Sequence, residues 1–292
     1  MLKSIQKALA AHPIPYKLIR SVWNPPKRIF RHLYFKGVFT VEVAPDASFR
    51  IQSFGSQIEN DLFWRGYGRG WEGTSLRIWR ELVKRAEFIA DVGANTGVFA
   101  LAAQALRPDA KIVAIEPSHR VFEKLCRNIA INDFGIRAVE VAASDTAGTA
   151  KFYDVPTEHQ YSASLEPTML GAGTVEVEVE VERLDRIFER CAFPRLDLMK
   201  MDVELHEPAA LRGMEKMLRK HRPNMLIEVL DGEHLESVRN VLDGLGYRFR
   251  AIMEEDDLAS PDKARGSSHN MLVCPEDVLD DLADFGSWLI EV

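Results

Sequence analysis

Apolar and polar positions follow a repeating order from Glu87 onward. Short apolar runs of strand length alternate with segments in which apolar residues recur at helical spacing, as over 98–106 and 121–131. The apolar runs predict seven strands, at 88–92, 112–115, 138–142, 196–201, 225–230, 247–253 and 271–274. Because strands that alternate with helices are typical of βα units, we expect an α/β domain over residues 86–292. It should contain a mainly parallel seven-stranded sheet with helices on both faces.

Two segments depart from this order. Residues 1–85 are irregular, and their alternating apolar positions at 38–43 and 49–51 predict strands, so we expect an N-terminal accessory lobe. Valines and glutamates alternate over 175–182, which places the two residue types on opposite faces of one strand. The segment from about 150 to 183 therefore predicts a small antiparallel β insertion in the α/β domain.

Composition and charge narrow the class of protein. A hydrophobic content of 46% over 292 residues is typical of a globular protein, and no apolar run approaches the roughly 18 residues that cross a bilayer. We therefore expect a cytoplasmic protein with no membrane span. The formal net charge of −7 argues against a nucleic-acid partner. Six lysines and arginines between residues 17 and 36 form at most a scattered basic surface.

The first predicted strand leads into a glycine-rich turn. Asp91 ends the strand, and Gly93, Asn95 and Gly97 follow before the next helix. Glycines at this place let the backbone approach a ligand closely, and a nicotinamide enzyme would normally show GxGxxG here. The sequence instead reads DxGxNxG. An acid in this position suits a cofactor with a cationic sulfonium and an ammonium group, such as S-adenosylmethionine.

Acidic residues also end the next two predicted strands. Glu116 follows about 20 residues after the glycine turn, where a carboxylate can accept hydrogen bonds from both ribose hydroxyls. Asp145, directly after Ser144, could accept the adenine amino group. A helix cap at Asp91, a surface position for Glu116 and a turn at Asp145 are each credible alone, but their order together favours a cofactor site.

Several motifs make the sequence similar to the FkbM-type methyltransferase family, over about residues 72–230 and again at 270–273. The matching segments are 88–97 (FIADVGANTG), 113–117 (VAIEP), 142–145 (AASD), 181–185 (VERLD) and 198–204 (LMKMDVE). The resemblance implies a Rossmann-like class I methyltransferase fold and S-adenosylmethionine as cofactor. It also implies O-methylation of a hydroxyl on a sugar, glycan or polyketide-like small molecule.

The last motif also holds the candidate acceptor chemistry. Asp202 is our first choice to touch the acceptor or remove its proton, with Glu204 and His206 beside it. Asp202 and Glu228 could together hold Mg²⁺, although we favour a site without metal. The family usually continues this motif as DVEG, whereas Leu205 stands here in place of the glycine. This difference implies a reshaped acceptor pocket or a loss of activity.

Two other functions compete with methyl transfer. A catalytically silent S-adenosylmethionine-binding protein would retain the cofactor residues and show no turnover. A nicotinamide-dependent oxidoreductase is disfavoured by the missing GxGxxG pattern.

Overall fold

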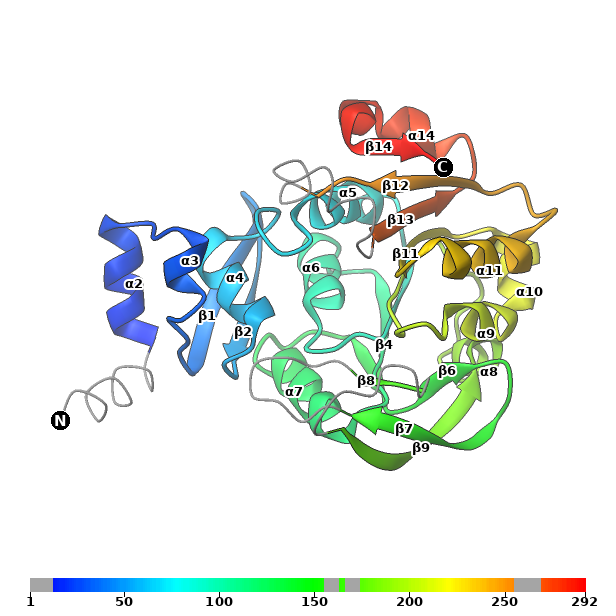
Figure 1. Cartoon of the computed structure of the whole chain (residues 1–292), viewed down its shortest axis with the longest axis horizontal. Helices are drawn as coiled ribbons and strands as arrows, with labels where there is room; N and C mark the ends of the chain where they lie inside the picture. Colours follow the sequence, from blue (N-terminus) through cyan, green and yellow to red (C-terminus); the bar gives the residue numbers. More distant parts are fainter. Residues whose placement is uncertain (1–12, 155–162, 166–173, 255–268) are drawn as a thin grey trace.

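A computed structural model describes residues 13–154, 163–165, 174–254 and 269–292 (Figure 1). Its main sheet has eight strands in the order β14-β12-β13-β11-β10-β3-β4-β5. The bounds are β3 Phe88–Val92, β4 Lys111–Ile115, β5 Arg137–Val139, β10 Leu198–Met201, β11 Asn224–Val229, β12 Arg248–Ile252, β13 His269–Cys274 and β14 Leu289–Glu291. The five strands from β5 to β11 are mutually parallel, and the other three run antiparallel to their neighbours.

The sheet differs from the sequence prediction at two places. Strand β14, which follows a short 3₁₀ helix at Ala283–Trp288, pairs with β12 and adds an eighth strand. The strand predicted at 138–142 is divided, because only Arg137–Val139 pairs with β4, whereas β6 (Ala142–Ser144) pairs with a strand of a second sheet. The apolar run therefore supplies two short strands rather than one.

Helices cover both faces of the main sheet, as predicted, because alternate strand residues point to opposite sides. Ile89 packs with one buried cluster and Ala90 with the other. The first face is covered by α5 (Gly73–Val83), α6 (Val98–Leu106) and α7 (His119–Ala130). The second face is covered by α8 (Leu184–Arg190), α9 (Glu207–Arg212), α10 (Glu215–His221) and α11 (Gly232–Leu242). A short helix, α14 (Val278–Asp281), precedes β14.

The N-terminal segment forms a hairpin with three helices around it. Its elements are α2 (Pro13–Val22), α3 (Lys27–Phe30), β1 (Gly37–Ala44), β2 (Ala47–Ser53) and α4 (Gln57–Arg65). Phe35 and Phe63 meet edge to face, with ring centroids 4.5 Å apart. The hairpin, α4 and α6 contribute to one buried cluster, and β1 and β2 contact α6, so this segment packs on the helices that cover the first face of the sheet. The division into units 1–85 and 86–292 stays a prediction.

The insertion forms a second sheet with the strand order β6-β9-β7-β8. Strand β7 (Gly148–Asp154) runs antiparallel to β9 (Val175–Arg183) and to β8 (Ala163–Ser164), whereas β6 runs parallel to β9. Along the valine face of β9, burial increases from Val175 and Val177, which are exposed, through Val179, which is partly buried, to Val181, which is buried. Within the described residues, no helix is long and apolar enough to cross a bilayer.

Candidate functional site

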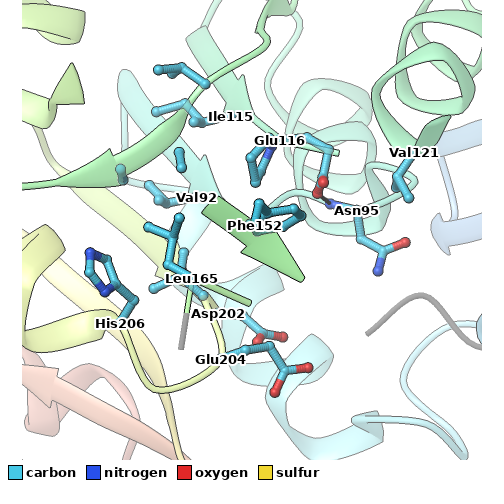
Figure 2. Close-up of a pocket in the computed structure, with 16 residues that line it drawn as sticks. Val92, Asn95, Ile115, Glu116, Val121, Phe152, Leu165, Asp202, Glu204 and His206 are labelled. Carbon is cyan, nitrogen blue, oxygen red and sulfur yellow. Dashed lines mark hydrogen bonds between the residues drawn. The ribbon is translucent and has the colours of Figure 1, made fainter. Parts of the chain in front are cut away.

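A pocket opens where the parallel strands β3, β4 and β10 end, beneath the insertion sheet (Figure 2). Six residues that the sequence singles out line it: Gly93, Asn95, Glu116, Asp202, Glu204 and His206. Ligands in sheets of this kind bind outside the carboxyl ends of the strands. The pocket therefore lies where the topology predicts a site, and it brings both sets of candidate residues together.

One side of the pocket is the glycine turn, residues 93–97. The amide groups of Gly93 and Ala94 both donate to the carbonyl oxygen of Ile115, at 2.9 Å each, which fixes the turn to the end of β4. Gly93 has φ 77°, and a Cβ atom added there would lie 1.8 Å from the carbonyl oxygen of Asp202. Only glycine fits this close approach. Gly97, with φ 94°, is the N-cap residue of α6.

Asp91 lies behind the turn and is not among the pocket-lining residues. Its Oδ2 accepts a hydrogen bond from the amide of Ala100 at 2.9 Å, which ties the first turn of α6 to β3. Burial raises the pKa of Asp91 to about 7, against the opposing effects of the Ala100 hydrogen bond and the charge of Lys200. Asp91 thus holds the first turn of α6 in place.

Glu116 lines the pocket and is held by two backbone donors. Its Oε2 accepts from the amide of Asn95 at 3.0 Å, and its Oε1 accepts from the amide of Ser118 at 2.9 Å. Burial raises its pKa to about 7, although both hydrogen bonds favour the charged form. The carboxylate is therefore fixed in orientation while each oxygen keeps further acceptor capacity.

The third predicted acid lies elsewhere. Asp145 is not a lining residue, and its Oδ2 pairs with Arg212 Nε at 2.9 Å. Ser144 does not line the pocket either, but its Oγ lies 3.1 Å from His206 Nε2. This strand end therefore reaches the pocket through Ala142 and Ala143, and Ser144 positions the His206 ring.

The acidic turn, residues 202–206, forms the opposite side of the pocket and joins β10 to α9. Glu204 and Leu205 have φ values of 55° and 76°, so two consecutive residues adopt the left-handed conformation that favours glycine. Leu205 thus adopts the left-handed backbone conformation that a glycine would readily adopt at this position. Burial, followed by the charges of Asp202 and Glu207, raises the pKa of Glu204 to about 7.

A buried cation lies beneath the acidic turn and was not assigned a role from the sequence. Lys200 Nζ donates to Asn270 Oδ1 at 2.9 Å and lies 3.7 Å from Asp202 Oδ2. Burial lowers the pKa of Lys200, but the charges of Asp202, Glu72, Glu228 and Asp91 outweigh burial and raise it overall. The sequence could have indicated this role, because a lysine inside the apolar strand Leu198–Met201 is a buried charge that needs partners.

We call Lys200, Asn270, Glu72, Asp202 and Glu228 the Lys200 cluster. Glu228 hydrogen-bonds Asp202, and burial together with the Asp202 charge raises the pKa of Glu228 to about 10. Glu72, from the segment before α5, hydrogen-bonds Asn270, and burial raises its pKa to about 7. The described residues contain no group of three or more His, Cys, Asp or Glu side chains arranged to hold a metal ion.

The insertion sheet contributes apolar contacts to the pocket. Phe152 and Leu165 line it, between Glu116 and the acidic turn in Figure 2. Ser164 Oγ donates to the carbonyl oxygen of Glu204 at 2.6 Å, so β8 is attached to the acidic turn. At the end of β7, Asp154 pairs with Arg120 of α7 at 2.8 Å. These contacts hold the insertion over both sides of the pocket.

A family model, the methyltransferase FkbM domain, matches residues 91–249, which is more than half of the chain. The chain belongs to the FkbM methyltransferase family. The matched region contains both turns and the insertion, and it ends within β12. With a mixed sheet covered on both faces, this FkbM-family protein has the Rossmann-like class I methyltransferase fold that the sequence predicts.

Named proteins in this family are similar over most of their length. Methyltransferase sdnD of Sordaria araneosa is 29% identical over 204 residues, which span 58% of this chain and 72% of that protein. The 31-O-demethyl-FK506 methyltransferase FkbM of Streptomyces tacrolimicus is 27% identical over 207 residues, spanning 60% of this chain and 77% of that protein.

Solved structures of methyltransferases are also similar. Methyltransferase FkbM from Methylobacillus flagellatus KT has 17% identity and a TM-score of 0.43, with 64% of this chain and 43% of that chain covered. This chain thus spans under half of that protein. The SAM-dependent methyltransferase from Agrobacterium tumefaciens has 14% identity and a TM-score of 0.45, with 81% and 69% covered.

Proposed function

We propose that this protein uses S-adenosylmethionine to methylate a hydroxyl group of a sugar, glycan or polyketide-like small molecule. The observation that carries the proposal is one pocket lined by Gly93, Asn95 and Glu116 on one side and by Asp202, Glu204 and His206 on the other. A cofactor and an acceptor can therefore meet in a single pocket. The Streptomyces tacrolimicus relative is named as a 31-O-demethyl-FK506 methyltransferase, and this name supports a hydroxylated small-molecule acceptor.

The glycine side of the pocket fits the cofactor. Glu116 presents two oriented oxygens to a pair of ribose hydroxyls, and Gly93 offers backbone without a Cβ atom. We propose that the adenine lies against Ala142 and Ala143 without contacting Asp145, which does not line the pocket and pairs with Arg212. When bound, S-adenosylmethionine supplies an electrophilic methyl group. Burial raises the pKa of Asp91 and of Glu116 to about 7, and a cationic ligand close to these carboxyl groups would favour their charged forms.

The acidic side of the pocket suits an acceptor hydroxyl. Asp202 is held by Lys200 and Glu228, so we propose that it orients the hydroxyl as a fixed hydrogen-bond acceptor. Glu204, with its pKa raised to about 7, would accept the hydroxyl proton when the acceptor oxygen takes the methyl group from the bound cofactor. His206 contacts the acceptor while Ser144 holds its ring.

We propose that the reaction needs no Mg²⁺. A divalent cation between Asp202 and Glu228 would lie beside the ammonium group of Lys200, which is 3.7 Å from Asp202 Oδ2 and already balances this charge. In-line positioning of the hydroxyl is the main requirement for methyl transfer to an acceptor oxygen.

Methyl transfer from isotope-labelled S-adenosylmethionine to a panel of sugars, glycans and polyketide alcohols tests the proposal. We expect a labelled methyl ether with at least one acceptor, and Glu204→Gln should lower kcat by about 10² to 10⁴ with cofactor binding retained. Because the base must lose its proton, wild-type kcat should rise with pH through about 7. Glu180→Gln, on the exposed face of β9, is the control and should leave kcat unchanged.

The silent-binder alternative predicts a different result in the same assay. It requires cofactor binding with no labelled product from any acceptor. The left-handed conformation of Leu205 does not favour it, because the acidic turn keeps the backbone shape that glycine would adopt there. The family match likewise gives no support to a nicotinamide-dependent oxidoreductase.

A further inference from the structure

Helix α2 presents an apolar surface at one end of the molecule. The α2 stripe consists of Ile14, Leu18, Val22 and Trp23, whose exposed fractions are 59%, 66%, 86% and 49%. Among the described residues, eight large hydrophobic side chains are exposed, and four of them belong to this stripe. In Figure 1, α2 stands at the edge of the N-terminal lobe, with the hairpin between it and the main sheet.

The stripe is distinct from the face by which α2 packs on the lobe. Ile14, Leu18 and Val22 follow each other at intervals of four residues, which places them on one side of the helix. The other side carries Tyr16, whose ring stacks on Phe35 with centroids 5.7 Å apart. The helix therefore has an inner apolar face that holds it to the lobe and an outer apolar face that meets solvent.

The part of the sequence that contains the stripe carries charge of one sign. Residues 1–41 contain eight lysines and arginines and no acid, whereas the rest of the chain carries 15 more acids than bases. Lys17 of α2 and Arg28 and Arg31 of the segment after it are exposed, whereas the Arg20 guanidinium lies over the Phe63 ring of the lobe. A protein with formal net charge −7 thus concentrates positive charge where it also exposes apolar side chains. This combination is typical of helices that lie in the interface of an anionic membrane.

We propose that the α2 stripe docks this protein on an anionic lipid bilayer, with the helix lying in the interface and not crossing it. The apolar side chains enter the boundary between headgroups and acyl chains, and the surrounding lysines and arginines contact lipid phosphates. A second copy of the chain fits this surface less well. A two-fold contact would bring the same cations of two copies together, and the stripe is small beside the roughly 800 Å² per partner of a stable interface.

Vesicle binding by the full chain tests the proposal. We expect co-sedimentation with vesicles that contain phosphatidylglycerol, weaker binding as salt rises from about 0.1 to 0.5 M, and little binding to pure phosphatidylcholine. Trp23 is the most exposed of the five tryptophans, so its fluorescence should shift to the blue on binding. Trp23→Phe should remove most of that shift.

Val22→Glu should lower the partition coefficient on anionic vesicles by about tenfold or more, because it places a carboxylate among acyl chains. The matched control is Val175→Glu. It makes the same substitution at a valine of the insertion whose side chain is also exposed, at 48%. Unchanged vesicle binding by Val22→Glu, or absence of wild-type binding, would overturn the proposal. In the latter case, a dimer that Val22→Glu converts to monomer would assign the stripe to a second copy. A lower melting temperature of Val22→Glu would instead show that the chain itself covers the stripe.

Discussion

The glycine turn and the acidic turn face each other across one pocket, but different interactions hold them in place. Backbone groups fix the glycine turn, since the Gly93 and Ala94 amides donate to Ile115 and two amides hold Glu116. Side chains support the acidic turn through the Lys200 cluster, whose members come from β10, β11, β13 and the segment before α5. The first arrangement is local in sequence and sterically strict, whereas the second depends on balanced charge.

This comparison predicts that substitutions in the glycine turn destabilise the protein through steric overlap. Gly93→Ala should destabilise the protein by about 3 kcal/mol or more, because a left-handed alanine also overlaps the Asp202 carbonyl oxygen. Chemical denaturation measures the effect, and binding of S-adenosylmethionine should be lost. Gly244→Ala is the matched control, since its φ is 71° and no atom lies within 4 Å of the added Cβ. A cost for Gly93→Ala that equals the control's would show that the close approach is unimportant.

Substitutions beneath the acidic turn should instead destabilise the protein by leaving buried charge uncompensated. Lys200→Met keeps the length of the side chain but leaves the nearby carboxylates without their cation, and we expect a loss of about 3 to 5 kcal/mol in the free energy of unfolding. Lys151→Met, at an exposed position on the insertion, should leave stability nearly unchanged. Equal stabilities of the two variants in denaturant titrations would contradict a structural role for the Lys200 cluster.

The smallest change in stability is expected at Leu205 in the acidic turn. Leu205→Gly relieves the left-handed strain at φ 76°, and after the entropic cost of glycine we expect a gain of up to about 1 kcal/mol. Leu205→Ala keeps the Cβ atom and should bring no gain. If Leu205→Gly proved no more stable than Leu205→Ala by thermal melting, the left-handed strain at this turn would be negligible. A turnover that appears only in Leu205→Gly would support the silent-binder alternative.

The same contrast explains which features the sequence predicts. The strands, the helices on both faces and the glycine turn follow local patterns, and the structure confirms them. Glu116 lies in the pocket because the end of β4 leads directly into it. The division of the strand predicted at 138–142 could not be predicted from the local pattern, because it depends on the pairing of Ala142–Ser144 with β9.

The Lys200 cluster shows why the rest was missed. Glu72 and Asn270 are separated by almost two hundred residues, and only the antiparallel pairing of β11 with β13 places Asn270 beside Glu228. Asp145 has the expected position at a strand end, yet Arg212 holds its side chain outside the pocket. A single sequence gives the order of side chains along a strand, but the partners that orient them come from distant segments.

Calorimetric binding of S-adenosylmethionine to the wild type, Glu116→Ala and Asp91→Ala tests the central claim most directly. We predict saturable one-site binding by the wild type. Glu116→Ala should abolish it because the ribose acceptors are removed, and Asp91→Ala should weaken it because α6 loses its anchor to β3. A folded wild-type protein that binds no S-adenosylmethionine, or a Glu116→Ala variant that binds it with unchanged affinity, would contradict the assignment of this pocket.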